Sequence, residues 1–107
     1  MSKQLEKRPG CIQETLKIMG DKWTPLILRD LNTADATFSE LEISLNGISP
    51  RTLSQRLSKL EEEAIIAKVM YCEHPPRYRY QITPKGRELQ SVLLKMGEWG
   101  EKYFDKT

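Results

Sequence analysis

Residues 47–66 read GISPRTLSQRLSKLEEEAII, and their charges are separated along the segment. The earlier part carries Arg51, Arg56 and Lys59, whereas the later part carries three consecutive acids, Glu61–Glu63. A helix dipole favours acids near the start of a helix and bases near its end. Because this segment has the opposite arrangement, helix stability alone does not explain its charge pattern.

The residues before this segment predict a helix that ends in a tight turn. Residues 37–40, TFSE, match a capping box, in which the first and fourth side chains satisfy free backbone donors at a helix start. Asn46-Gly47 supplies the left-handed conformation that ends such a helix. Ser49-Pro50 then pairs an N-cap residue with a proline at the first helical position. Two short helices joined in this way predict a helix-turn-helix.

The second of these helices, expected over residues 49–63, has one apolar and one polar face. At 100° per residue a narrow buried stripe is formed by Leu53, Leu57, Leu60 and Ala64. On the outward face Arg51 can read guanine and Gln55 can read adenine, Thr52 is also expected at a base edge, and Lys59 can hold a phosphate. The first turns of such a helix enter the major groove and its far end leaves it. DNA binding therefore explains bases early in the helix and acids late in it, and the three acids should not contact DNA.

Arg56 lies closer to the apolar stripe than the other bases of this helix. We expect it to hold a phosphate or an acid inside the protein. Beyond residue 64 the pattern alternates, which predicts a hairpin of strands 65–71 and 77–83 with Pro75-Pro76 at its tip. Arg77, beside the tip, is placed to meet the phosphate backbone or the minor groove. Arg79 either shares this role or is an ordinary outward strand charge.

The two ends of the chain complete a single domain of mainly helical class. A flexible, charged arm is expected over residues 1–10, and a winged helix-turn-helix domain over 11–107, with short helices within 11–19 and 21–32. The last helix, about 84–104, is long for so small a domain. Its apolar stripe is the predicted homodimer contact, with a core inside one chain as the alternative; the stripe comprises Leu89, Val92, Leu93, Met96, Trp99 and Tyr103.

Composition narrows the classes of function. The 107 residues include seventeen Lys and Arg against fifteen Asp and Glu, so the basic charge is local to the predicted helix and not global. No apolar run approaches the roughly 20 residues that cross a bilayer, and no secretory signal is visible, which predicts a cytoplasmic protein without a membrane partner. One histidine and no nucleophile–base pattern predict that the chain is not an enzyme. Cys72-Glu73-His74 offers too few ligands for a metal, and no cofactor is expected.

Taken together, the motifs GDKWTPLILRDL, FSEL, GISPRTLSQRLSKLEE, PPRYRYQIT and TPKG resemble the HxlR-type family of bacterial winged helix-turn-helix regulators, relatives of the MarR-like repressors. The resemblance covers nearly all of residues 11–100. It implies a homodimeric transcription factor that binds double-stranded DNA at a pseudo-palindromic operator. It places Arg77 on the wing and the following residues on the recognition helix: Ser49, Pro50, Arg51, Thr52, Gln55 and Arg56. The chain departs from the family at Ile12, often proline, and at Pro25, more usually apolar.

Cys11 is a candidate redox switch. Some proteins that resemble this chain sense oxidants or electrophiles at the corresponding cysteine, and a thiolate near a helix N-terminus is stabilised by free N–H groups and the helix dipole. The alternative is an inert thiol that behaves as a small apolar side chain. An alternative for the whole chain is a winged-helix module that binds another protein and has no specific DNA site. The effector, the operator and the direction of regulation do not follow from the residues.

Overall fold

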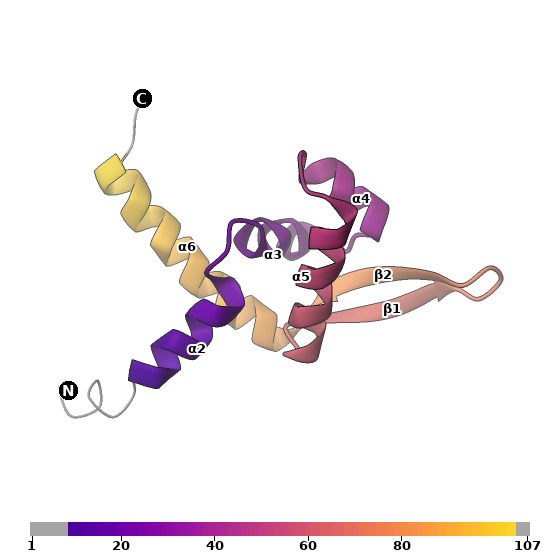
Figure 1. Cartoon of the computed structure of the whole chain (residues 1–107), viewed down its shortest axis with the longest axis horizontal. Coiled ribbons are helices and arrows are strands. Elements are labelled where there is room, and N and C mark those ends of the chain that lie inside the picture. Colours follow the sequence, from indigo (N-terminus) through magenta and orange to yellow (C-terminus); the bar gives the residue numbers. More distant parts are fainter. Residues whose placement is uncertain (1–8, 105–107) are drawn as a thin grey trace.

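The computed structural model describes residues 9–104, which form five helices and one antiparallel hairpin (Figure 1). The order is α2 (Pro9–Met19), α3 (Thr24–Thr33), α4 (Phe38–Ser44), α5 (Pro50–Glu62), β1 (Ile66–Cys72), β2 (Arg77–Ile82) and α6 (Pro84–Phe104). The hairpin projects from one side of the central helices, whereas α2 and α6 extend from the other side. This arrangement confirms the predicted winged helix-turn-helix.

The predicted turn chemistry of the helix-turn-helix is present. The Thr37 hydroxyl accepts a hydrogen bond from the Glu40 backbone N–H at 3.1 Å, and the Glu40 carboxylate accepts one from the Thr37 N–H at 2.8 Å. Gly47 has a φ of 97°, a conformation that L residues with a Cβ rarely adopt. The chain can therefore reverse between α4 and α5 within a few residues.

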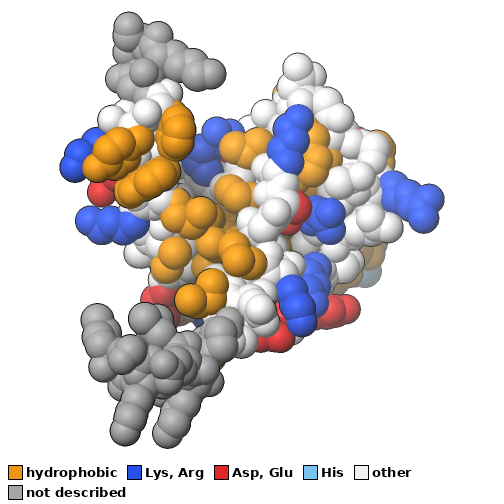
Figure 2. Space-filling view, turned by 60° about the vertical axis from the view of Figure 1, so that its left-hand side comes forward, with side chains coloured by type: hydrophobic (Ala, Val, Ile, Leu, Met, Phe, Trp, Pro, Cys, Tyr) orange, Lys and Arg blue, Asp and Glu red, His pale blue; other side chains and the backbone are white. Residues whose placement is uncertain are grey.

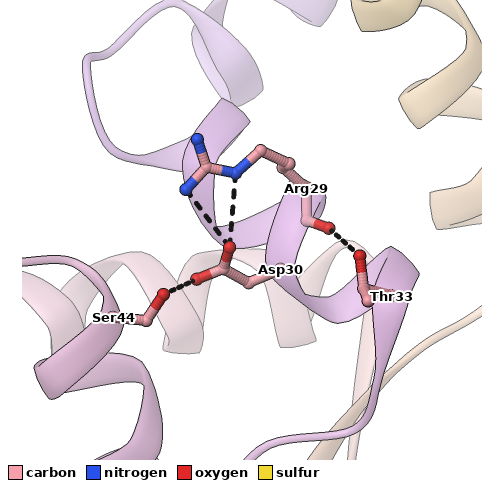
Figure 3. Close-up of polar contacts among 4 residues, drawn as sticks. All are labelled: Arg29, Asp30, Thr33 and Ser44. Carbon is pink, nitrogen blue, oxygen red and sulfur yellow. Dashed lines mark hydrogen bonds and ion pairs between the residues drawn. The ribbon is translucent and has the colours of Figure 1, made fainter.

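A polar network fixes α4 against α3 (Figure 3). The Asp30 carboxylate on α3 accepts a hydrogen bond from the Ser44 hydroxyl on α4 and pairs with the neighbouring Arg29 guanidinium at 3.2 Å. The Thr33 hydroxyl donates to the Arg29 carbonyl at 3.3 Å. The Ser44–Asp30 hydrogen bond joins the two helices and helps to orient the first helix of the helix-turn-helix, whereas the other two contacts lie within α3.

The core lies between α3, α4, α5 and the base of the hairpin. Its fully buried side chains include Ile27, Leu28, Leu31, Leu41, Leu53, Leu57, Leu60, Ile65 and Ile66. Burying each of these side chains stabilises the folded state by about 1.5–3 kcal/mol, so this cluster is the main source of stability. The predicted stripe of α5 is correct for its three leucines and wrong for Ala64. That residue follows the end of the helix, has a φ of 58° and is exposed, because the chain turns there into β1.

The hairpin is anchored near its base by a backbone bridge to a segment outside it. In the register Ile66 pairs with Ile82, Lys68 with Tyr80 and Met70 with Tyr78. Tyr80 also exchanges two backbone hydrogen bonds with Ala36, at 2.7 and 3.1 Å. This isolated bridge attaches β2 to the segment between α3 and α4.

The hairpin tip lies where the sequence predicts it, whereas the first described helix begins earlier than expected. The tip is a turn over residues 73–76, which includes the two predicted prolines. Helix α2 begins at Pro9, two residues earlier than expected, because a proline suits the first turn of a helix, where its missing N–H is not needed. Residues 1–8 of the expected arm and residues 105–107 lie outside the described part of the chain.

Candidate nucleic-acid interface

The start of α5 is held by its N-cap. The Ser49 hydroxyl accepts from the Thr52 backbone N–H at 3.1 Å and donates to the Thr52 hydroxyl at 2.9 Å, and Pro50 occupies the first turn. A serine cap of this kind is worth about 1 kcal/mol. The first turn of α5 is therefore a well-defined platform for the side chains that follow it.

Arg51 and Gln55 lie on the exposed face of α5, opposite the buried leucines. Within residues 9–104 Arg51 makes no ion pair and neither side chain makes a hydrogen bond, so both remain available to a ligand. Thr52 is half-buried and shares its hydroxyl with the cap. The predicted exposed face is present, and its contact with DNA stays a prediction.

Arg56 pairs with an acid of the same chain. Its Nε lies 3.3 Å from Asp21 Oδ1 but makes no hydrogen bond, so the contact is an ion pair without an aligned N–H. Asp21 also accepts hydrogen bonds from the Trp23 and Thr24 backbone N–H groups, both at 2.8 Å, and from the Thr24 hydroxyl at 2.6 Å. Burial by itself would raise the pKa of Asp21, but the Thr24 and Trp23 hydrogen bonds and the Arg56 charge outweigh it and lower the pKa. We expected Arg56 to hold either a phosphate or an acid inside the protein, and the structure shows it paired with an acid, Asp21.

Lys59 is also paired. Its Nζ lies 3.6 Å from Glu63 Oε1, one turn further along α5. An exposed pair at this spacing is worth only a few tenths of a kcal/mol. Lys59 can therefore exchange its partner for a phosphate at little cost.

The two wing arginines differ in their surroundings. Arg77 follows the tip, is exposed and has no ion pair among residues 9–104. The Arg79 guanidinium stacks over the Tyr71 ring, 4.6 Å from its centroid. Such a cation–π contact is worth about 0.5–1 kcal/mol at an exposed site. Arg77 is therefore the more available cation.

A groove of about 720 Å³ separates α5 from the wing, and the sequence did not predict it. Residues from α4, α5 and both strands line it, among them Ser54 and Ser58 on α5 and Lys68 on β1. Lys68 lies on the same face of β1 as the buried Ile66. In an alternating strand that face is expected to be apolar, so a lysine there is the sequence signal that could have identified Lys68 as a functional residue. The groove lies beside the exposed face of α5.

A second surface, far from the wing, is apolar. Figure 2 shows hydrophobic side chains gathered on the face formed by α2 and α6. We call this surface the α2–α6 face; its most exposed members are Ile12, Leu16, Val92, Met96, Trp99 and Tyr103. Leu89 and Leu93 are half-buried and pack against the core of the same chain. The last helix thus contributes both to the core and to an exposed apolar surface.

The two cysteines are separate. Cys11 is exposed in the first turn of α2, next to Ile12 of the α2–α6 face, whereas Cys72 is half-buried at a bulge of β1 opposite Arg77. Neither belongs to a group of potential metal ligands within residues 9–104. In the same residues, no helix has both the length and the apolar character needed to cross a membrane.

The chain is similar to known regulators in sequence and in structure. The model of the HxlR-like helix-turn-helix family matches residues 18–107. The HTH-type transcriptional regulator YdeP of Bacillus subtilis is 37% identical over 98 residues, which cover 91% of this chain and 77% of YdeP.

Two solved structures share the fold. One is a MarR-family transcriptional regulator from Enterococcus faecalis V583, with a TM-score of 0.82, 30% identity and coverage of 92% of this chain and 89% of the other. The other is the redox regulator HypR in its oxidised form, with a TM-score of 0.78, 31% identity and coverage of 88% and 97%. The chain therefore belongs to the HxlR-like helix-turn-helix family, whose members are transcriptional regulators and not enzymes.

Proposed function

We propose that this regulator binds double-stranded DNA in a sequence-specific manner, with Arg51, Thr52 and Gln55 of α5 at base edges and Arg77 of the wing at the phosphate backbone or the minor groove. The observation that carries the proposal is the exposed face of α5 with Arg51 and Gln55, whose side chains have no partner among residues 9–104. The buried leucines of α5 hold the helix on the core, and Ser49 caps its start. Arginine and glutamine are the side chains that read guanine and adenine bidentately.

The test begins with a duplex selected by the protein from a random-sequence pool. Binding to it should weaken steeply with salt, because phosphate contacts release counterions. Arg51→Ala should lower affinity for the selected duplex by about 1–3 kcal/mol and relax sequence preference at one position. Lys17→Ala is the matched control, since Lys17 pairs with Glu14 on α2, away from the wing. Binding that does not depend on salt or on Arg51 would favour the protein-binding alternative.

The regulator is further proposed to act as a homodimer on a pseudo-palindromic operator, with the α2–α6 face as the contact between protomers. Exposed apolar patches of this kind mark interaction surfaces. A two-fold dimer presents two recognition helices to half-sites about one DNA turn apart. Dimer symmetry thus accounts both for the exposed Trp99 and Tyr103 and for the position of the wing on the opposite side of the molecule.

Redox control through Cys11 is a second proposal. It is supported by the exposed thiol on α2, adjacent to the α2–α6 face, and by the similarity to the redox regulator HypR. Oxidation or an adduct at Cys11 would alter the proposed dimer contact and so the spacing of the recognition helices. Diamide or methylglyoxal should change affinity for the selected duplex in the wild type and in Cys72→Ser but not in Cys11→Ser. An equal response in all three proteins would assign the effect to another site.

A further inference from the structure

The groove between α5 and the wing has two walls of different chemistry. One wall carries hydroxyl groups, with Ser54 and Ser58 on successive turns of α5. The other wall carries two cations of the wing, Lys68 and Arg77. Hydroxyl groups and cations together are the side chains that hold phosphate oxygens.

Lys68 is positioned in this groove and its charge is not neutralised. Its Nζ lies 4.7 Å from the centroid of the Tyr78 ring, which also lines the groove. Its partner across the strands is the buried Tyr80, so the backbone beneath Lys68 is fixed to the core. Among residues 9–104, no carboxylate forms an ion pair with Lys68. The ammonium is therefore held at the wall and is free to accept an anionic partner.

The one acid of the groove lies at the end of α5. Glu61 is close enough to Tyr80 that its charge, after the larger effect of burial, contributes to raising the pKa of that phenol. An anion would be repelled there and attracted along the wing wall. The charges thus favour an anionic chain that passes Ser54, Ser58 and Lys68 and leaves before Glu61.

We propose that one phosphodiester strand of the bound duplex lies in this groove, with the Lys68 ammonium at a phosphate and the Ser54 and Ser58 hydroxyls beside the same strand. The proposal rests on the DNA binding proposed above and adds a site to it. A small ligand is normally buried over most of its surface in an enclosed pocket. This groove is open to solvent, as a continuous strand requires. Lys68 would position the recognition helix without reading bases.

The experiment compares Lys68→Gln with wild type on the duplex selected from the random pool and on an unrelated duplex of equal length. Loss of one phosphate contact should make the slope of log K against log salt shallower by roughly one for each bound protomer, on both duplexes alike. Lys17→Gln, which removes an equal charge from α2, should keep the wild-type slope.

Single methylphosphonate substitutions in the selected duplex then locate the contact. Neutralising the phosphate that Lys68 contacts should weaken binding of wild type and leave Lys68→Gln unaffected. An unchanged slope in Lys68→Gln, with the selected duplex still bound, overturns the groove proposal, leaves the proposed function intact and favours a small anionic ligand. A wild type that binds neither duplex overturns both proposals.

Discussion

At the scale of single residues, Asp21 joins α3 to α5. Its carboxylate caps the start of α3 through three hydrogen bonds and pairs with Arg56 of α5. Asp21 lies two residues after the end of α2, and its side chain joins the start of α3 to α5. Arg56 therefore positions α5, and its predicted role at a phosphate is not needed to explain its place in the sequence.

Asp21→Asn should destabilise the fold by about 1–3 kcal/mol at neutral pH, because hydrogen bonds to a charged group are lost or weakened. The pKa of Asp21 is lower in the folded state than its unfolded value of about 3.9. Its contribution is therefore fully present above about pH 5, and it is lost progressively as pH falls through the unfolded pKa and then the lower folded pKa. Urea unfolding at pH 7 and pH 3 should show the difference between wild type and variant shrinking at the lower pH. A constant difference would show that the charge of Asp21 contributes nothing.

At the scale of elements, Gly86 sets the distance between α6 and the base of the wing. A Cβ at this position would collide with the Ile65 carbonyl and lie 2.7 Å from Ile82 Cγ1. The Thr83 hydroxyl fastens the same junction, because its single O–H lies within hydrogen-bond distance of both the Ala64 and the Ile65 carbonyl, at 2.7 and 3.0 Å. The start of α6 and the start of β1 consequently behave as one packed unit.

Gly86→Ala should destabilise the protein by about 1–3 kcal/mol, because overpacking forces α6 away from β1. Gly97→Ala is a matched control on the same helix, since a Cβ there meets nothing within 4 Å. It should leave stability unchanged or raise it by up to about 1 kcal/mol, because alanine is the better helix former. Thermal unfolding of both variants measures the contrast. Equal losses at the two glycines would remove the packing explanation.

At the scale of the whole molecule, the proposed DNA surface and the α2–α6 face lie on different sides of the chain. A dimer formed through the α2–α6 face would leave both wings and both α5 helices uncovered. In the proposed dimer, a change at Cys11 would act on DNA binding through the relative placement of the two protomers. A substitution on one of the two surfaces therefore leaves the side chains of the other surface in place.

Trp99→Glu should shift the protein from dimer to monomer at micromolar concentration, because it places a charge in the α2–α6 face, where Trp99 is 59% exposed within one chain. Leu94→Glu is the control: Leu94 is 56% exposed but lies about 140° around α6 from Trp99. Sedimentation equilibrium across a concentration series distinguishes the two variants. A wild type that is monomeric throughout would remove the dimer proposal.

Local patterns in the sequence determined most of the architecture. The capping box at residues 37–40, the Gly47 turn, the Ser49-Pro50 start and the leucine stripe of α5 act between residues a few positions apart, so periodicity and turn chemistry predict them. The alternating strands and the exposed face with Arg51 and Gln55 follow from the same short-range rules.

Only the tertiary structure decided which side chains meet across long separations. Arg56 pairs with Asp21, which lies far from it in the sequence. Lys68 shares a groove with Ser54 and Ser58, which lie on another element. Leu89 and Leu93 pack against the core, whereas Trp99 of the same stripe is exposed. Each of these outcomes depends on how packed elements are oriented, which residue spacing along one element does not specify. For that reason the sequence predicted the helix-turn-helix and the exposed polar face of α5, whereas the groove beside the wing emerged only from the packing of α4, α5 and the hairpin.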